Sequence, residues 1–296
     1  MVIMSTSSNA VNDVAGISAT PATPYLGAEL HGVDLSRPLS DAGFARVREL
    51  FFEHSVVCLR GQQISPEEFA TFSARFGRLE IHHMTEHVMP HLPHVRVLSN
   101  VKKGGRSVGI AKGGMHWHSD LSYTPVPALA TLLYGIECPP EGADTQFADM
   151  RAGYAALRAE IQTLIRGKMG LHDRNFRYSA LYPNRPPLTD AQVAGVPPVA
   201  HPLVRRHPVT GSISAFVSKD VVAGIVGMDE AHARPLIEEI EATGTRAEFV
   251  YAHKWQPGDV LIWDNTCTLH RATPYDNKYN RTLYRTQVRG ETPIHA

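Results

Sequence analysis

The residues best suited to bind a metal ion stand at two widely separated places in this chain. His118 and Asp120 are two positions apart, and His270 follows far downstream. On an extended strand, residues i and i+2 project from the same face, so His118 and Asp120 can contact one ion without backbone distortion. A distant strand carrying His270 would complete a facial set of two imidazoles and one carboxylate, leaving about three positions of an octahedral ion open. Such a site requires a fold that joins strands from distant parts of the sequence.

This donor set is typical of non-haem Fe(II) sites, although a His-x-Asp pair alone is more often an ordinary surface or hydrogen-bonded pair. Arg281 and Arg285 follow His270 and are four residues apart. On a strand they would share a face, with Cα atoms about 13 Å apart. They could therefore hold two different anionic groups along a pocket. Salt bridges at the rim of a sheet are the alternative.

Apolar periodicity predicts strands on both sides of the candidate ligands. The expected strands cover residues 25–30, 55–60, 95–99, 118–120, 129–137, 212–217, 248–252, 259–263 and 281–288, and the expected helices cover 40–53, 65–77, 149–157 and 229–243. We therefore expect a β-rich α+β domain with peripheral helices over residues 22–296. The small polar residues 1–21 have no periodic pattern and predict a flexible arm. Residues 101–114 and 175–200 are expected to be irregular.

Charge and composition argue against several classes of protein. The 29 basic and 29 acidic residues give a net charge of zero without long charge runs, so neither nucleic acid nor an anionic membrane is an expected partner. Neither a signal peptide nor an apolar run of about 18 residues is recognisable. The three cysteines, Cys58, Cys138 and Cys267, fit neither a disulfide framework nor a zinc motif. We expect a cytoplasmic protein that acts on a small molecule.

Several motifs together resemble the TauD/TfdA family, which contains the taurine and aryloxyalkanoate dioxygenases. The family carries W-H-[ST]-D, then G-x-D-T-x-F, then W-D-N-x-x-x-x-H-x-A and two arginines. This chain has Trp117-His118-Ser119-Asp120, Gly142-Ala143-Asp144-Thr145-Gln146-Phe147, Trp263-Asp264-Asn265 leading to His270-Arg271-Ala272, and then Arg281 and Arg285. The resemblance extends from about residue 26 to residue 289.

The resemblance implies a distorted double-stranded β-helix, or jelly roll, that uses Fe(II), 2-oxoglutarate and O2. The iron ligands would be His118, Asp120 and His270, and Arg281 and Thr145 would bind 2-oxoglutarate. Oxidative decarboxylation to succinate would be coupled to hydroxylation of a substrate C–H bond, in some cases with cleavage of a carbon–heteroatom bond. The carboxylate of Asp120 favours hydroxylation over chlorination, because related halogenases lack it. Members commonly self-associate, which implies a homo-oligomer.

The substrate implied by the resemblance is a small organic acid such as a sulfonate, a carboxylate or an aryloxyalkanoate. Arg285 would bind its acidic group, helped by His82, and Phe216 would be an apolar wall of the pocket or an ordinary core residue. Thr85 replaces a tyrosine of the sulfonate-using members, and the asparagine common just before Trp117 is absent. Both departures argue against taurine itself.

Other interpretations stay open. The same oxidative chemistry could act on a neutral or amino-acid-like natural product, by desaturation or cyclisation. A metal-dependent hydrolase or isomerase, or a non-catalytic binding module, could share the barrel, but neither explains Thr145 together with two arginines. The histidine-rich stretch 82–94 could form a second metal site on a helix or, more simply, a loop, since Pro90 and Pro93 would break the helix. His201 could touch substrate or hydrogen-bond the backbone; we favour the backbone.

Overall fold

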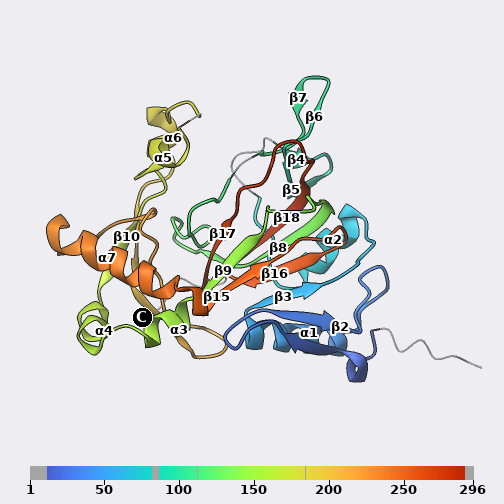
Figure 1. Cartoon of the computed structure of the whole chain (residues 1–296), viewed down its shortest axis with the longest axis horizontal. Coiled ribbons are helices and arrows are strands. Elements are labelled where there is room, and N and C mark those ends of the chain that lie inside the picture. Colours follow the sequence, from blue (N-terminus) through green and yellow to red (C-terminus); the bar gives the residue numbers. More distant parts are fainter. Residues whose placement is uncertain (1–11, 82–86, 112, 184, 291–296) are drawn as a thin grey trace, which may run out of the picture.

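A large mixed sheet forms the centre of the computed structural model, which describes residues 12–81, 87–111, 113–183 and 185–290 (Figure 1). In spatial order its strands are β1 (Ser18–Pro21), β2 (Ala28–His31), β3 (Val56–Leu59), β16 (Val260–Asp264), β8 (Ala128–Glu137), β18 (Thr282–Arg289), β5 (Leu92–Ser99) and β4 (Val88–Met89). Neighbours are antiparallel, apart from the parallel pair β2–β3. Strands from the two ends of the sequence thus lie side by side.

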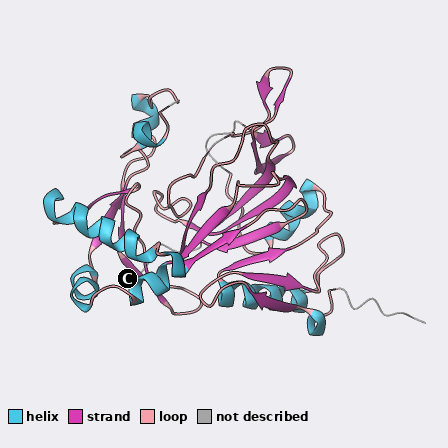
Figure 2. Ribbon diagram, in the orientation of Figure 1, coloured by secondary structure: helices cyan, strands magenta, loops and turns pink. Residues whose placement is uncertain are grey.

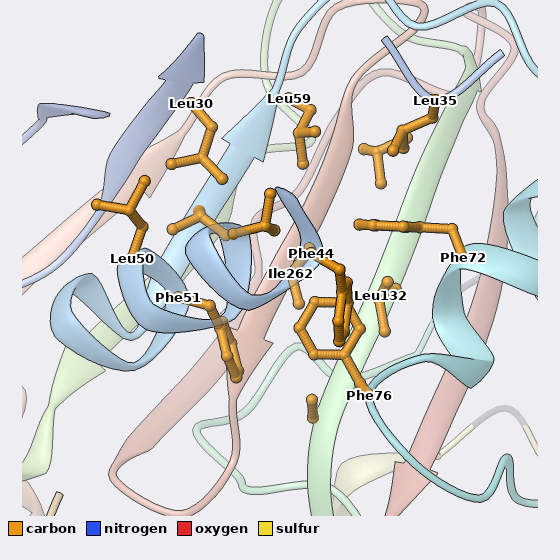
Figure 3. Close-up of a cluster of buried hydrophobic side chains, with 14 of the residues drawn as sticks. Leu30, Leu35, Phe44, Leu50, Phe51, Leu59, Phe72, Phe76, Leu132 and Ile262 are labelled. Atoms are coloured by element: carbon orange, nitrogen blue, oxygen red, sulfur yellow. The ribbon is translucent and has the colours of Figure 1, made fainter. Parts of the chain in front are cut away.

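Two helices cover one face of this sheet. They are α1 (Asp41–His54) and α2 (Pro66–Ala74). The predicted start of α2 is confirmed: Ser65 and Glu68 form a capping box, each side chain bonding the other's backbone N–H. Aromatic side chains of this helical layer pack on alternate residues of the central strands, among them Leu132 and Ile262 (Figure 3). The intervening residues therefore point to the opposite face.

A second, smaller sheet packs on that opposite face. It consists of β15 (Val250–His253), β9 (Thr145–Asp149) and β17 (Thr268–Ala272), all antiparallel. Phe147 of β9 is fully buried against Trp263 of β16, with ring centroids 5.4 Å apart, and shares a core with Leu133 and Leu283 of the large sheet. The two sheets therefore enclose one apolar layer, and the predicted jelly roll with peripheral helices is confirmed.

A third layer of helices and short strands lies beside the sandwich (Figure 2). Its helices are α3 (Met150–Ala155), α4 (Ala159–Ile165), α5 (Tyr178–Leu181), α6 (Asp190–Ala194) and α7 (Glu230–Gly244). Its strands are β10 (Met169–His172), β11 (Val199–Pro202), β14 (Val222–Ile225), β12 (Val204–Arg206) and β13 (Ile213–Ala215). Helices α3 and α7 cross closely, since a Cβ on Gly153 would stand 2.4 Å from the Cα of Gly244. These two glycines permit that approach.

Three expectations about irregular segments are wrong in part. The predicted arm over 1–21 contains the 3₁₀ turn η1 (Val14–Gly16) and β1, which pairs with β2 through its backbone while its side chains stay largely exposed. An edge strand of this kind has no apolar alternation to reveal it. Residues 101–114 contain the hairpin β6 (Lys102–Lys103) and β7 (Arg106–Ser107), and residues 175–200 contain α5, α6 and the start of β11.

One further short element, the 3₁₀ turn η2 (Ala247–Phe249), precedes β15. In the part of the chain that the structure describes, none of the helices combines the length and apolar character needed to cross a bilayer.

Candidate active site

The two histidines of the predicted metal site are joined through their backbones. The His118 N–H donates to the His270 carbonyl at 3.0 Å, and the His270 N–H donates to the His118 carbonyl at 2.8 Å. This isolated bridge is the only part of 118–120 that pairs as a strand, so the strand predicted there is wrong. Asp120 begins a turn instead, because its N–H donates to the Asn265 side chain and Leu121 takes a left-handed backbone with φ of 55°.

The side chains of His118, Asp120 and His270 converge on one point. One potential ligand atom from each lies within 4.8 Å of the other two. The Asp120 carboxylate oxygens lie 3.9 Å from His118 Nε2 and 3.7 Å from His270 Nε2, too far for hydrogen bonds. His118 Nδ1 lies 2.9 Å from the His116 carbonyl, which leaves Nε2 to face the shared point. The donor set and its spacing fit a divalent ion.

Asp120 is fixed by a buried hydrogen-bond network. The Thr131 hydroxyl donates to Asp120 Oδ2 at 2.7 Å, and the Asn265 amide donates to Thr131 Oγ1 at 2.9 Å. Asn265 Oδ1 accepts from the Asp120 N–H and from Trp263 Nε1. Sequence reasoning used Asn265 as a motif residue but missed Thr131, which sits in an apolar strand without a distinguishing signal.

The electrostatics favour the protonation states that a metal ion needs. Burial raises the pKa of Asp120, but His270, Arg285, His118 and the Thr131 hydroxyl together outweigh burial and hold that pKa below its usual value. Burial, reinforced by His118, holds the pKa of His270 well below its usual value. The carboxylate is therefore ionised and the imidazole neutral, which are the forms that ligate metals.

A cavity of about 320 Å³ opens over these three residues and includes Thr145, Arg281 and Arg285 in its walls. Thr145 on β9 accepts a hydrogen bond from Trp255 Nε1 at 3.0 Å, so its own hydroxyl proton can be donated elsewhere. Arg281 stands just before β18, and its buried Nε has no acceptor in the described part of the chain. Burial lowers the pKa of Arg281. A hydroxyl donor and a desolvated guanidinium thus line the same cavity.

Comparisons with known proteins agree with this arrangement. The family model "Taurine catabolism dioxygenase TauD, TfdA family" matches residues 18–287. The chain belongs to the TauD/TfdA family of dioxygenases. It is 33% identical to the (S)-phenoxypropionate/alpha-ketoglutarate-dioxygenase of Delftia acidovorans, covering 93% of this chain and 95% of that protein. It is 32% identical to the alpha-ketoglutarate-dependent 2,4-dichlorophenoxyacetate dioxygenase of Cupriavidus pinatubonensis, covering 91% and 96%.

The TauD/TfdA fold is also found in a solved structure. The crystal structure of AAD-2 in complex with Mn(II) and N-oxalylglycine has a TM-score of 0.81 and 29% identity, covering 94% of this chain and 99% of that chain. The predicted family is therefore confirmed, and so is an enzyme that uses Fe(II), 2-oxoglutarate and O2. These findings favour a dioxygenase over a hydrolase, an isomerase or a binding module.

The predicted substrate residues of this TauD/TfdA member have different outcomes. Arg285 lines the cavity. His82 lies outside the described residues. Phe216 is wrong as a pocket wall: it is buried between the His172 ring, at a centroid distance of 4.7 Å, and the Arg205 guanidinium, at 3.7 Å, away from the lining of the cavity. An inward-facing aromatic after a strand predicts burial but not which core it joins.

His201 behaves as the simpler interpretation predicted, with Nε2 2.9 Å from the Thr124 carbonyl. Sequence reasoning missed Arg96, a cavity-lining residue on β5. Its neighbours Val95 and Val97 are buried, and Val95 packs in the core beneath α1 and α2. The alternation of valine and arginine in Val95–Leu98 was the signal that could have found it.

Proposed function

We propose that this dioxygenase binds Fe(II) through His118, Asp120 and His270, binds 2-oxoglutarate through Arg281 and Thr145, and hydroxylates a C–H bond of a small organic acid. The observation that carries the proposal is the convergence of three ligand atoms at the floor of a cavity whose walls contain Thr145, Arg281 and Arg285. Iron, 2-oxoglutarate and O2 together supply the oxidation, in which 2-oxoglutarate becomes succinate and CO2 while the substrate carbon gains a hydroxyl group.

The residues of the chain have distinct tasks in this proposal. Arg281 pairs with the distal carboxylate of 2-oxoglutarate, because a buried guanidinium lacking an acceptor at Nε gains most from a bidentate anion. Thr145 donates its free hydroxyl proton to the same carboxylate, since its oxygen already accepts from Trp255. Asp120 stays ionised, and the Thr131 hydroxyl fixes the direction of its carboxylate. These contacts orient 2-oxoglutarate and the Asp120 carboxylate.

Arg285 is proposed to bind the acidic group of the substrate. Its Nη1 lies 3.8 Å from Asp120 Oδ1. A substrate whose acidic group binds this guanidinium would therefore have the carbon next to that group close to the metal ligands. The relatives from Delftia and Cupriavidus are named for phenoxy acids, which supports an acid as substrate. The alternative of a neutral or amino-acid-like substrate stays a prediction, as do self-association and a cytoplasmic location.

The test is a succinate-release screen with Fe(II), 2-oxoglutarate and either phenoxy acids, sulfonates or amino acids, with oxygen uptake measured in parallel. Acids should stimulate succinate release in the wild type. In Arg285→Gln the KM for the acid should rise at least about 30-fold while the KM for 2-oxoglutarate changes little, because one partner of a desolvated charge pair is lost. Arg46→Gln, at a partly exposed position of α1 that does not line the cavity, is the matched control. An equal rise in KM for the acid and for 2-oxoglutarate would assign Arg285 to 2-oxoglutarate binding instead.

A further inference from the structure

Arg96 and Arg285 are direct cross-strand partners. Strands β5 and β18 are antiparallel, and their register places Arg285 opposite Arg96. Partners in register project from the same face of a sheet, with Cβ atoms about 5 Å apart. Both residues line the cavity, as do Leu98 and Gln287, two positions further along the same strands. Two guanidinium groups therefore enter the cavity side by side.

This pair is poorly compensated by the protein itself. Arg96 is only 7% exposed, and no carboxylate lies within salt-bridge distance of it in the described residues. The buried Nε atoms of both arginines lack acceptors in the same part of the chain. Burial, and next the charge of Arg285, lower the pKa of Arg96 to about 10. Like charges directly opposite each other destabilise a sheet, so some other group must offset them.

Asp120, a carboxylate near both arginines in the described part of the chain, compensates their charge only in part. Arg285 approaches Asp120 Oδ1 at 3.8 Å, beyond hydrogen-bond distance, and its Nη2 donates to Gln287 Oε1 at 2.9 Å. The Asp120 carboxylate already receives the Thr131 hydroxyl and faces His118 and His270. Arg281, the proposed anchor of 2-oxoglutarate, stands just before β18 and four residues before Arg285. The charges of Arg96 and Arg285 are thus available to a further anion.

We propose that Arg96 and Arg285 form one oxyanion site that holds the acidic head group of the substrate between two guanidinium groups. This inference rests on the proposed function and adds Arg96 as a residue that determines specificity. A carboxylate, a sulfonate and a sulfate ester share the necessary chemistry, because each offers two or more oxygens to two donor forks. A head group in this position keeps its adjacent carbon beside Asp120 and the two histidines.

The test measures binding without turnover. Protein loaded with Mn(II) and 2-oxoglutarate is titrated calorimetrically with phenoxyacetate, phenoxymethanesulfonate and the neutral 2-phenoxyethanol. The wild type should bind at least one acid about tenfold or more tightly than the alcohol, and the better acid identifies the head group. Arg96→Gln should weaken acid binding at least about 30-fold, as should Arg285→Gln, while the alcohol changes less than about threefold. Arg96→Lys should bind the acid more tightly than Arg96→Gln but less tightly than the wild type. Lysine supplies the positive charge without the bidentate geometry of the guanidinium group.

Two controls separate this role from a structural one and from the proposed function. Without acid, Arg96→Gln should unfold at the same temperature as the wild type or higher, because an uncompensated cation is removed; Arg46→Gln should match the wild type in every assay. The inference would be overturned if Arg96→Gln kept its affinity for the acid, or if its affinity for 2-oxoglutarate fell equally. It would also be overturned by a clear drop in the unfolding temperature of Arg96→Gln, or by a wild type that binds neither acid. Absence of any 2-oxoglutarate binding in the wild type would instead overturn the proposed function.

Discussion

His118 and His270 hold each other through reciprocal backbone hydrogen bonds of 3.0 and 2.8 Å. The bridge fixes the separation of the two imidazoles through the main chain, and Asn265 ties Asp120 to the same place. Backbone contacts of the fold therefore hold the three residues close to one another.

Removal of the metal ion should lower the stability of the protein without unfolding it. Chelation should leave the far-UV circular dichroism spectrum unchanged, because the bridge and the sheets do not depend on the ion. The unfolding temperature should still fall, since an ion present at about 100 times its Kd stabilises the native state by about 2.7 kcal/mol. Loss of the β spectrum on chelation, reversed by Mn(II), would show that the ion organises the site.

Thr131→Val should weaken metal binding without preventing folding. The substitution removes the hydroxyl that donates to Asp120 Oδ2 at 2.7 Å and accepts from Asn265 at 2.9 Å. Partners of metal ligands are typically worth about 10- to 100-fold in metal affinity. Titration with Mn(II) should show a loss in that range, with Thr71→Val on exposed α2 as the control. An unchanged Mn(II) affinity would mean that Asp120 does not need this support.

Arg281→Gln should act on 2-oxoglutarate and spare the metal. The buried guanidinium is the proposed partner of the distal carboxylate, so its loss should weaken 2-oxoglutarate binding by about 2 kcal/mol or more, equivalent to about 30-fold. Binding of Mn(II) alone should match the wild type. Equal 2-oxoglutarate affinity in the variant and the wild type would remove Arg281 from the proposed contact.

His172 should make the metal-free protein sensitive to mild acid. Burial lowers the pKa of this imidazole from 6.5 to about 3. Below about pH 6.5, His172 is protonated in the unfolded chain but stays neutral in the folded chain. The free energy of unfolding therefore falls as the pH falls from about 6.5 towards 3. Between pH 7 and pH 5 this residue alone should remove about 2 kcal/mol from the free energy of unfolding.

The matching variant is His172→Gln, which stays neutral throughout this range. Urea titrations at pH 7 and pH 5 should show a smaller loss in the variant than in the wild type, by about 2 kcal/mol. Because other buried histidines are common to both proteins, the difference isolates His172. The same pH dependence in both would mean that His172 takes up its proton in the folded state.

Much of the site could be predicted because its chemistry restricts residue types. The two imidazoles and the carboxylate that converge on one point, and the arginine in the wall of the same cavity, all lie in short recognisable motifs around His118, His270 and Arg281. The start of the helix expected over residues 65–77 was equally clear, because the spacing of Ser65 and Glu68 in the capping box follows from helix geometry.

What could not be predicted depends on long-range pairing. Asp120 leaves the strand because the Asn265 side chain captures its N–H, a contact between residues 145 positions apart. β1 is recognisable only through its pairing with β2, and Phe216 packs between His172 and Arg205. The position of Arg96 beside Arg285 depends on the register of β5 and β18, which local periodicity does not reveal.

The most direct test of the central claim is an anaerobic titration of the protein with Fe(II) and 2-oxoglutarate, followed by visible absorption. The wild type should develop a weak charge-transfer band that saturates at one iron per chain, and Asp120→Ala should lose both the band and succinate release. A well-folded wild type without the band, or an Asp120→Ala variant that retains it with near-normal succinate production, would contradict the assignment of His118, Asp120 and His270 as the iron ligands.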